Sequence, residues 1–269
     1  MAVRIAVAGA AGKMGRRIIA LASARDDVRC VAALERRGSP AIGTDAGALA
    51  GADGPPVPVT EHPQEGFDVL VEFSTPSGTL AWLDECLRSA RPIVIGTTGH
   101  TETEWSRIRA AARSIAVLKA PNMSVGVNVL LRTVRQLAGI LDPSYDVEIV
   151  ETHHRFKVDA PSGTALALRD AVMEGRKKAE AAESIVVYGR HGESGPRPSG
   201  EIAVHALRSG DVVGEHTVSF GTIGETVTVA HAARSRDVFA AGALRAAKWI
   251  AGRPPGLYDM QDVLFGETS

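Results

Sequence analysis

A glycine-rich turn directly follows the first apolar run of the chain, and it constrains the fold more than any other feature. Residues 3–10 (VRIAVAGA) form an uninterrupted run that is typical of a strand buried on both faces. Residues 14–24 then place apolar side chains at helical spacing. The turn between them holds Gly9, Gly12 and Gly15. Glycine permits a sharp turn close to a pyrophosphate, and the helix that follows offers N–H groups to such an anion.

The spacing of these glycines departs from the usual dinucleotide fingerprint. That fingerprint reads G-x-G-x-x-G, whereas this turn reads G-x-x-G-x-x-G, with Ala11 at the position of the second glycine. The context of strand, turn and helix therefore predicts nucleotide binding more strongly than the spacing does. The alternative is a tight turn with no ligand.

The first part of the chain repeats this alternation of strand and helix. Apolar runs predict strands at 3–10, 28–35, 67–74, 91–98 and 115–120. Helical spacing predicts helices at 14–24, 75–90 and 101–114, the last opening with a capping box of Thr101 and Glu104. Short connections between them indicate a parallel, doubly wound α/β sheet. The segment 37–66 is rich in glycine, proline and alanine, and we expect a long, partly irregular loop there.

The pattern changes after about residue 122. Helices are expected at 124–141, 163–182 and 236–252, and a strand at 145–154. Four further β runs, separated by turns that contain glycine, lie between residues 184 and 233 and predict a mixed or antiparallel sheet. The sequence thus predicts two domains, the first α/β and the second α+β.

Charge and composition exclude several classes of function. A formal net charge of −1 over 269 residues gives no basic excess for nucleic acid and no polybasic segment for a membrane surface. The two cysteines cannot build a secreted disulfide framework, and the N-terminus does not resemble a signal peptide. We therefore expect a cytoplasmic protein that binds neither nucleic acid nor membranes.

Polar and small residues follow several of the predicted parallel strands, where such folds bind their ligands. Glu35 at the end of 28–35 suits the ribose diol of NADH, and Arg36 suits the 2′-phosphate of NADPH, so use of both cofactors is expected. The alternative is an ordinary solvated charge cluster. The segments 96–99 (GTTG) and 120–124 (APNMS) are expected at the same edge, next to a nicotinamide ring, although alone each would be only a turn.

A cluster of proton donors marks the second domain. His153 and His154 end the strand at 145–154, Lys157 follows, and Ser162 is a suitable N-cap for a helix that begins with Gly163 and Thr164. The N–H groups of that first turn form an anion site, while histidine and lysine can move protons near neutral pH. These residues predict a small substrate that carries carboxylates and has a centre that must receive a proton.

Structural roles are the alternative for these histidines. Adjacent residues of a strand point to opposite faces, so only one of the pair need face a substrate. Two histidines without a nearby cysteine or carboxylate array do not predict a metal site. The remaining six histidines are scattered, and no role is assigned to them.

The string ETHHRFKVDAPSGTA (151–165), together with VAGAAGKMGR, GTTG and APNMSVGVN, resembles the bacterial 4-hydroxy-tetrahydrodipicolinate reductase (dihydrodipicolinate reductase) family, and the resemblance runs through nearly the whole chain. It implies a homotetramer. It also implies a Rossmann-like dinucleotide-binding domain (1–122, rejoined by 236–269) and a domain for substrate binding and tetramerisation (123–235). The implied reaction is NAD(P)H-dependent reduction of a cyclic dicarboxylate with loss of water, in lysine and diaminopimelate biosynthesis.

The resemblance also assigns roles to residues of this chain. His153 and Lys157 match the groups that handle the proton as hydride reaches C4 of the ring, and the sequence does not choose between them. Contacts with the substrate carboxylates are matched by His154, Gly163 and Thr164. Contacts with the cofactor are matched by Gly9, Ala10, Ala11, Gly12, Lys13, Met14, Gly15, Glu35, Arg36, Gly96, Thr97, Thr98, Ala120, Pro121, Asn122 and Met123.

Two residues depart from the family pattern. Phe156 stands where some members have a third histidine, and Met123 stands where phenylalanine is frequent. The competing functions are another nicotinamide-dependent dehydrogenase that acts on an amino acid, and a redox-sensing protein that binds NAD(P)H without turnover. The first would lack the string at 151–165, and the second would make it dispensable.

Overall fold

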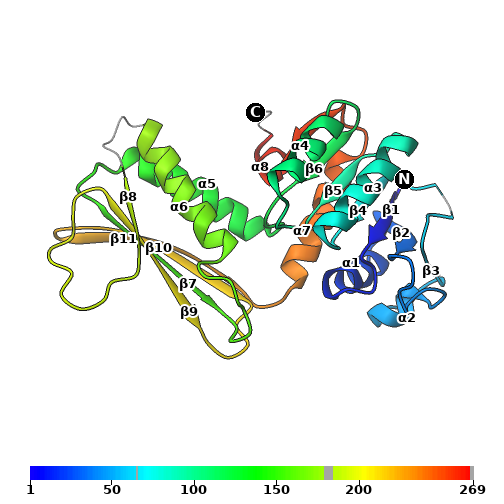
Figure 1. Cartoon of the computed structure of the whole chain (residues 1–269), viewed down its shortest axis with the longest axis horizontal. Helices are drawn as coiled ribbons and strands as arrows, with labels where there is room; N and C mark the ends of the chain where they lie inside the picture. The colour runs from blue at the N-terminus through cyan, green and yellow to red at the C-terminus, as the bar shows by residue number, and fades with distance from the viewer. Residues whose placement is uncertain (65, 179–183, 267–269) are drawn as a thin grey trace. The chain divides into compact units, whose positions relative to one another are not determined.

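The computed structural model describes residues 1–64, 66–178 and 184–266 (Figure 1). The chain divides into two compact units. Unit 1 combines Met1–Val125 with Arg236–Ser269, and unit 2 is Gly126–Ser235. The chain therefore leaves unit 1, builds unit 2 and returns through α7 (Asp237–Ile250), the orange helix in Figure 1.

Unit 1 is built on a parallel sheet whose strand order is β12-β6-β5-β4-β1-β2-β3. Every neighbouring pair in this sheet is parallel. The strands are β1 (Val3–Ala8), β2 (Val28–Leu34), β3 (Val59–Thr60), β4 (Val69–Glu72), β5 (Ile93–Ile95), β6 (Ala116–Lys119) and β12 (Gly256–Tyr258). Since the strands are parallel, their carboxyl ends meet at one edge of the sheet, where ligands of such folds bind.

Helices cover both faces of this sheet, as the α/β pattern requires. They are α1 (Lys13–Ser23), α2 (Ala46–Ala50), α3 (Pro76–Ser89), α4 (Glu102–Ala111), α7 and α8 (Met260–Phe265). One buried cluster joins the sheet to α1 and α7, and another joins it to α3 and α4. The predicted capping box is confirmed, because the Thr101 hydroxyl accepts from the Glu104 N–H and the Glu104 carboxylate accepts from the Thr101 N–H.

Unit 2 is a mixed five-stranded sheet in the order β11-β10-β7-β9-β8. The strands are β7 (Asp146–His153), β8 (Ile185–Tyr188), β9 (Glu201–Arg208), β10 (Gly214–Thr222) and β11 (Glu225–Ala233). Strand β10 is antiparallel to both β7 and β11, while β9 is parallel to β7 and β8.

Two helices of unit 2, α5 (Val125–Ile140) and α6 (Gly163–Lys178), pack against its sheet, and Figure 1 shows them side by side. Their contact is close, since a Cβ atom on Gly175 would lie 2.3 Å from the carbonyl oxygen of Arg135. Their apolar faces form one buried cluster with the inward side chains of the sheet, among them Val147, Ile149 and Phe220.

The predicted α/β plus α+β fold class is confirmed, with differences in detail. The segment 37–66 is more ordered than expected, since it contains α2 and β3. Strand β12 and helix α8 follow the last predicted helix and were not expected. The helix expected at 163–182 is described as far as Lys178, and residues 179–182 lie outside the described residues. Within the described residues, no helix is long and apolar enough to cross a membrane.

Candidate functional site

The glycine turn after β1 is shaped by close backbone contacts. Gly9 has a φ of +76°, and a Cβ atom there would lie 2.2 Å from the carbonyl oxygen of Phe73. A Cβ atom on Gly15 would lie 2.1 Å from the carbonyl oxygen of Gly9, so α1 can pack against the turn only because this residue is glycine. Gly12 is the N-cap of α1 and offers no side chain to its N–H groups, and the first turn holds no acidic residue. This is the geometry and charge that an entering phosphate requires.

Glu35 is held beside the glycine turn. Its carboxylate accepts a hydrogen bond of 3.0 Å from the Ala11 N–H, which fixes the acidic group at the carboxyl end of β2. Arg36 and Arg37 are exposed, and neither guanidinium forms an ion pair with any described residue. A cavity of about 580 Å³ is lined by these residues together with His62 and Trp82. The arrangement can take a ribose diol on the carboxylate and a phosphate on a guanidinium.

A buried carboxylate that the sequence analysis did not single out anchors the GTTG segment. Glu72 at the end of β4 is 0% exposed, and it accepts hydrogen bonds from the hydroxyls of Thr97 and Thr79, each at 2.9 Å. It also accepts from the N–H of Ser74 at 2.7 Å. Since Thr97 is a predicted cofactor contact, Glu72 ties this contact to the sheet. In the sequence, the only sign of this role is that Glu72 is a charged residue within the apolar run at 67–74.

Lys119 supports the same segment from β6. Its ammonium donates to the Thr97 carbonyl oxygen at 3.2 Å and lies 4.9 Å from the ring centre of Trp105. Burial lowers the pKa of Lys119, although the Glu72 carboxylate opposes that effect. Gly96 lies where a Cβ atom would be 2.2 Å from the ring of Phe73, so this glycine is required by packing.

The predicted cofactor residues all lie at or just beyond the carboxyl ends of β1, β2, β5 and β6, but their exposure differs. Ala10, Gly15, Ala120 and Met123 are buried, whereas Gly12, Lys13, Arg36, Thr98 and Pro121 are exposed. Met123 is 2% exposed and belongs to the core of unit 1, where its carbonyl oxygen would be 1.8 Å from a Cβ atom on Gly242 of α7. Its side chain thus packs against the protein interior.

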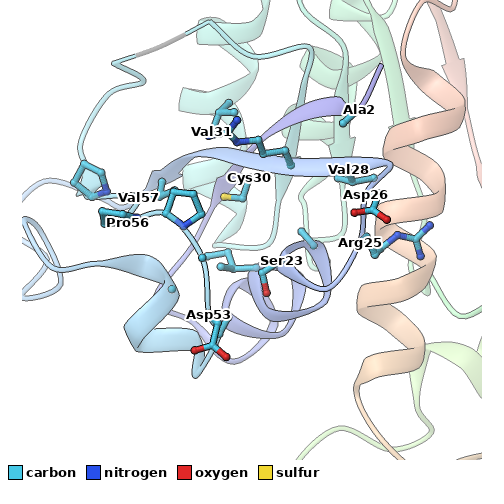
Figure 2. Close-up of a pocket in the computed structure, with 18 residues that line it drawn as sticks. Ala2, Ser23, Arg25, Asp26, Val28, Cys30, Val31, Asp53, Pro56 and Val57 are labelled. Atoms are coloured by element: carbon cyan, nitrogen blue, oxygen red, sulfur yellow. The ribbon is translucent and has the colours of Figure 1, made fainter.

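A second cavity of unit 1 lies away from the glycine turn (Figure 2). It has a volume of about 320 Å³ and is lined by the amino-terminal part of β2, by Ser23 of α1 and by the proline-containing segment at Pro56 and Val57. Cys30 borders it, and burial raises the pKa of this thiol to about 12, which keeps it protonated at neutral pH. None of the predicted cofactor or substrate residues lines this cavity, so it lies outside the candidate site.

Glu151 is the centre of the polar cluster in unit 2. It is 0% exposed on β7, and its carboxylate oxygens lie 2.5 Å from Nδ1 of His153 and 3.0 Å from the Arg208 guanidinium. It also accepts from the Ser162 N–H at 3.0 Å. Burial alone would raise the pKa of Glu151, but the hydrogen bonds from His153, Arg208 and Ser162 outweigh it, and the pKa is lowered. An ionised carboxylate thus holds three elements of the site together.

His153 is partly buried and remains close to Lys157. Burial lowers the pKa of His153, and the charges of Lys157 and Arg208 act in the same direction, although the hydrogen bond that His153 makes to the Glu151 carboxylate opposes them. The imidazole is therefore mainly neutral near pH 7. The Lys157 ammonium forms an ion pair with the Asp159 carboxylate at 2.9 Å, and 21% of the Lys157 side chain is exposed. Of the two predicted proton donors, the lysine is the one that carries a charge.

The start of α6 has the N-cap that the sequence predicts. The Ser162 hydroxyl accepts from the Ala165 N–H at 3.2 Å, as an N-cap does, so the predicted cap is confirmed. A Cβ atom on Gly163 would meet no atom of the chain within 4 Å, and its φ is not positive. Packing within the chain therefore does not explain the glycine, and the position of the missing Cβ atom is open space. His154 lies nearby in sequence, and its buried Nδ1 has no partner within the described residues.

The structure adds Arg208 and His216 to the residues expected from the sequence. Arg208 faces His153 across the parallel β7–β9 pair, and His216 faces Glu151 across the antiparallel β7–β10 pair. Glu151 could have been expected from the sequence, because it lies two residues before His153 and therefore on the same face of the strand. Arg208 and His216 could not, because their places next to the site depend on how the strands pair. Within the described residues, no group of three or more histidine, cysteine or acidic side chains is placed to hold a metal ion.

Comparison with known proteins matches nearly the whole chain to one family in two consecutive parts. Residues 3–123 match the family model described as "Dihydrodipicolinate reductase, N-terminus", and residues 126–264 match "Dihydrodipicolinate reductase, C-terminus". The chain is 49% identical over 267 residues to the 4-hydroxy-tetrahydrodipicolinate reductase of Thiobacillus denitrificans, covering 98% of this chain and 99% of that protein. It is 50% identical over 262 residues to the protein of the same name from Rubrobacter xylanophilus, covering 97% and 98%.

Solved structures share the fold at lower sequence identity. The dipicolinate-bound dihydrodipicolinate reductase from Paenisporosarcina sp. TG-14 has a TM-score of 0.75 at 24% identity, covering 98% of this chain and 100% of that one. An amine dehydrogenase from Mycobacterium smegmatis has a TM-score of 0.63 at 12% identity, covering 96% and 94%. Because enzymes with different names share this fold, the fold by itself does not select a substrate.

Proposed function

The chain belongs to the dihydrodipicolinate reductase family, and from this premise we propose that it reduces 4-hydroxy-tetrahydrodipicolinate to tetrahydrodipicolinate, with loss of water, in lysine and diaminopimelate biosynthesis. The family expected from the string at 151–165 is thereby confirmed. The protein is an NAD(P)H-dependent oxidoreductase. The observation that carries the proposal is that this string brings a cationic lysine, a neutral histidine and a helix N-terminus into one unit around Glu151.

Unit 1 fits the nicotinamide cofactor. The glycine turn leaves room for a pyrophosphate, α1 presents an N-terminus without acidic residues, and Glu35 is fixed where a ribose diol would bind. Arg36 is available for the 2′-phosphate of NADPH, so both NADH and NADPH can serve. Glu72 and Lys119 keep the GTTG segment in place for the nicotinamide end. When bound, the reduced cofactor supplies the hydride for C4 of the substrate ring.

Unit 2 fits the diacid. The N–H groups of Gly163 and Thr164 at the start of α6, together with His154, are the groups that bind the substrate carboxylates. A helix N-terminus stabilises an anion through its unpaired N–H groups and its dipole, and the missing Cβ atom at Gly163 leaves space for the carboxylate to reach them. The product keeps both carboxylates, so these groups can orient the ring throughout the reaction.

Proton delivery completes the reduction. Hydride addition at C4 of the conjugated imine leaves an enamine, which must be protonated at the neighbouring carbon. Lys157 is the proton donor in this proposal because its ammonium is charged and partly exposed, whereas the pKa of His153 is lowered by burial. His153, held by Glu151, orients the lysine or returns a proton to it from solvent. Asp159 keeps the ammonium in place between turnovers.

Replacing Gly163 by alanine separates binding of the diacid from folding. Since the added methyl group meets no atom of the chain, we expect the free energy of unfolding to stay within about 1 kcal/mol of the parent. We expect KM for the substrate to rise about tenfold, because the methyl group occupies the space of a bound carboxylate and weakens a charge-assisted hydrogen bond. Steady-state kinetics with each substrate varied in turn measure this, with KM for NADPH unchanged.

Gly66→Ala is the matched control for this variant. Gly66 also has open space around its missing Cβ atom and no positive φ, but it lies in unit 1. It should leave both KM values as they are. An unchanged substrate KM in Gly163→Ala would show that the start of α6 does not bind the diacid.

We further infer that the protein acts in the cytoplasm as a homotetramer, with unit 2 providing the subunit contacts. Support comes from the exposed apolar side chains of this unit, which include Leu207 at 51% and Ile223 at 102% exposure. Strand β11 is exposed or partly exposed at every position before Ala233, which is consistent with a sheet that pairs with another copy.

A further inference from the structure

His216 occupies a position where an apolar side chain would be expected. It lies on β10 on the same face as Val218 and Phe220, which belong to the core of unit 2, and only 3% of it is exposed. Burying an imidazole costs free energy unless its polar atoms find partners. A phenylalanine would fill a similar volume without that cost. Because the buried Nδ1 of His216 has no hydrogen-bond partner within the described residues, the reason for a histidine here must lie in what its other ring nitrogen, Nε2, does.

One ring nitrogen of His216 meets the N-cap of α6. Its Nε2 lies 3.2 Å from the Ser162 hydroxyl, and both groups are buried. The same hydroxyl accepts from the Ala165 N–H in the first turn of the helix. Burial lowers the pKa of His216 to about 4, so the ring is neutral at pH 7. A neutral imidazole can accept the serine proton, which leaves the serine oxygen to cap the helix.

The other edge of His216 borders His153. The two rings meet edge to face, with centroids 5.2 Å apart and planes at 75°. Gly214 closes the same space, since a Cβ atom there would lie 3.0 Å from Nε2 of His153 and 3.7 Å from Cε1 of His216. The His153 ring thus lies between the Glu151 carboxylate on one side and the His216 ring and Gly214 on the other. These two residues lie outside the string at 151–165.

We propose that His216 is a positioning residue of the substrate site, which fixes the Ser162 hydroxyl and with it the first turn of α6, and which keeps the His153 ring against Glu151. The inference rests on the proposed function, because the first turn of α6 is the anion site of that proposal. Through Ser162, whose N–H also donates to Glu151, His216 connects the anion site to the histidine.

Three substitutions at His216 test this role. A glutamine amide reaches the place of Nε2 and can accept from Ser162, an asparagine amide reaches only the place of Nδ1, and a phenylalanine keeps the ring without a polar atom. We expect KM for the diacid to rise about tenfold in His216→Asn and His216→Phe, as for the loss of one buried hydrogen bond. In His216→Gln it should stay within about threefold of the parent. The Kd for NADPH, measured by fluorescence titration, should be unchanged in all three.

The parent enzyme distinguishes failure of this inference from failure of the proposed function. A parent that does not oxidise NADPH with the substrate contradicts the proposed function. An active parent with an unchanged KM in His216→Phe, or with equal losses in His216→Gln and His216→Phe, contradicts the positioning role. A merely structural role would lower the melting temperature without this difference between glutamine and asparagine.

Ser162 provides the test if His216→Phe does not fold. Ser162→Thr keeps the hydroxyl and should keep the parent KM for the diacid, whereas Ser162→Ala should raise KM about tenfold. Adding His216→Asn to Ser162→Ala should change KM no further, because the two residues act through one hydrogen bond. Additive losses in the double variant would overturn the inference.

Discussion

Replacing Lys157 by methionine lowers kcat by about 10² to 10⁴-fold, the range that a positioned general acid contributes. Methionine keeps much of the length and apolar character of the stem but removes the ammonium that pairs with Asp159. Because Lys157 lies in unit 2, the Kd for NADPH should not change. Steady-state turnover and fluorescence titration of the cofactor measure the two quantities separately.

Lys177→Met is the matched control for this variant. Lys177 is exposed on α6 in the same unit, so the same substitution there should leave both kcat and the cofactor Kd at parent values. If Lys157→Met reduced the substrate at the parent rate, the proton would have to come from another group. A loss of NADPH affinity equal to the loss of turnover would place the lysine in cofactor binding instead.

Glu151→Gln lowers both stability and turnover. The substitution removes the charge that holds the Arg208 guanidinium and the His153 ring, and it leaves the arginine next to a neutral amide. Breaking a buried ion pair by removing one partner costs about 3–5 kcal/mol of unfolding free energy. We also expect kcat to fall, since His153 loses the group that orients it. Chemical denaturation and steady-state kinetics measure the two effects.

The same variant should also change the dependence of stability on pH. The pKa of Glu151 is lowered in the folded state, so the stabilisation it provides is present above the ordinary pKa of a glutamate. That stabilisation is lost as the pH falls through the lowered value. The free energy of unfolding of Glu151→Gln should therefore fall less steeply than that of the parent under acid conditions.

Glu148→Gln is the control on the same strand. Glu148 forms ion pairs with Arg190, Arg197 and His205, but a third of its side chain is exposed. Exposed ion pairs contribute little, so we expect a loss of about 1 kcal/mol or less and no change in kcat. Equal losses of stability and turnover in both variants would show that Glu151 is not special to the site.

The main elements of both units could be predicted because each leaves a local pattern. Strands such as β1 and β6 are apolar runs, since a parallel sheet covered by helices buries both faces. Helix α2 has only five residues and depends on Asp45, whose carboxylate accepts from the N–H groups of Ala48 and Val57. Strand β12 has three residues and exists because β6 pairs with it. Such short elements take their stability from distant partners, which periodicity does not reveal.

Some residues of the candidate site could likewise be predicted from the sequence, and others could not. Glu151, His153, Lys157 and Gly163 stand within one string, so their chemistry could be read from the sequence. His216 faces Glu151 only through the antiparallel register of β7 and β10, and Glu72 reaches Thr97 from a neighbouring strand. These residues support the site through contacts that the order of the chain does not show.

Transfer of deuterium from NADPH carrying two deuterium atoms at C4 of the nicotinamide tests the central claim most directly. In ordinary water, the account predicts that each NADPH oxidised yields one tetrahydrodipicolinate with a single deuterium at ring C4 and no deuterium at the neighbouring carbon, which takes its proton from the protein and solvent. Mass spectrometry and proton NMR of the product measure both positions. Oxidation of the cofactor without deuterium in the product, or no oxidation with the substrate present, would contradict it.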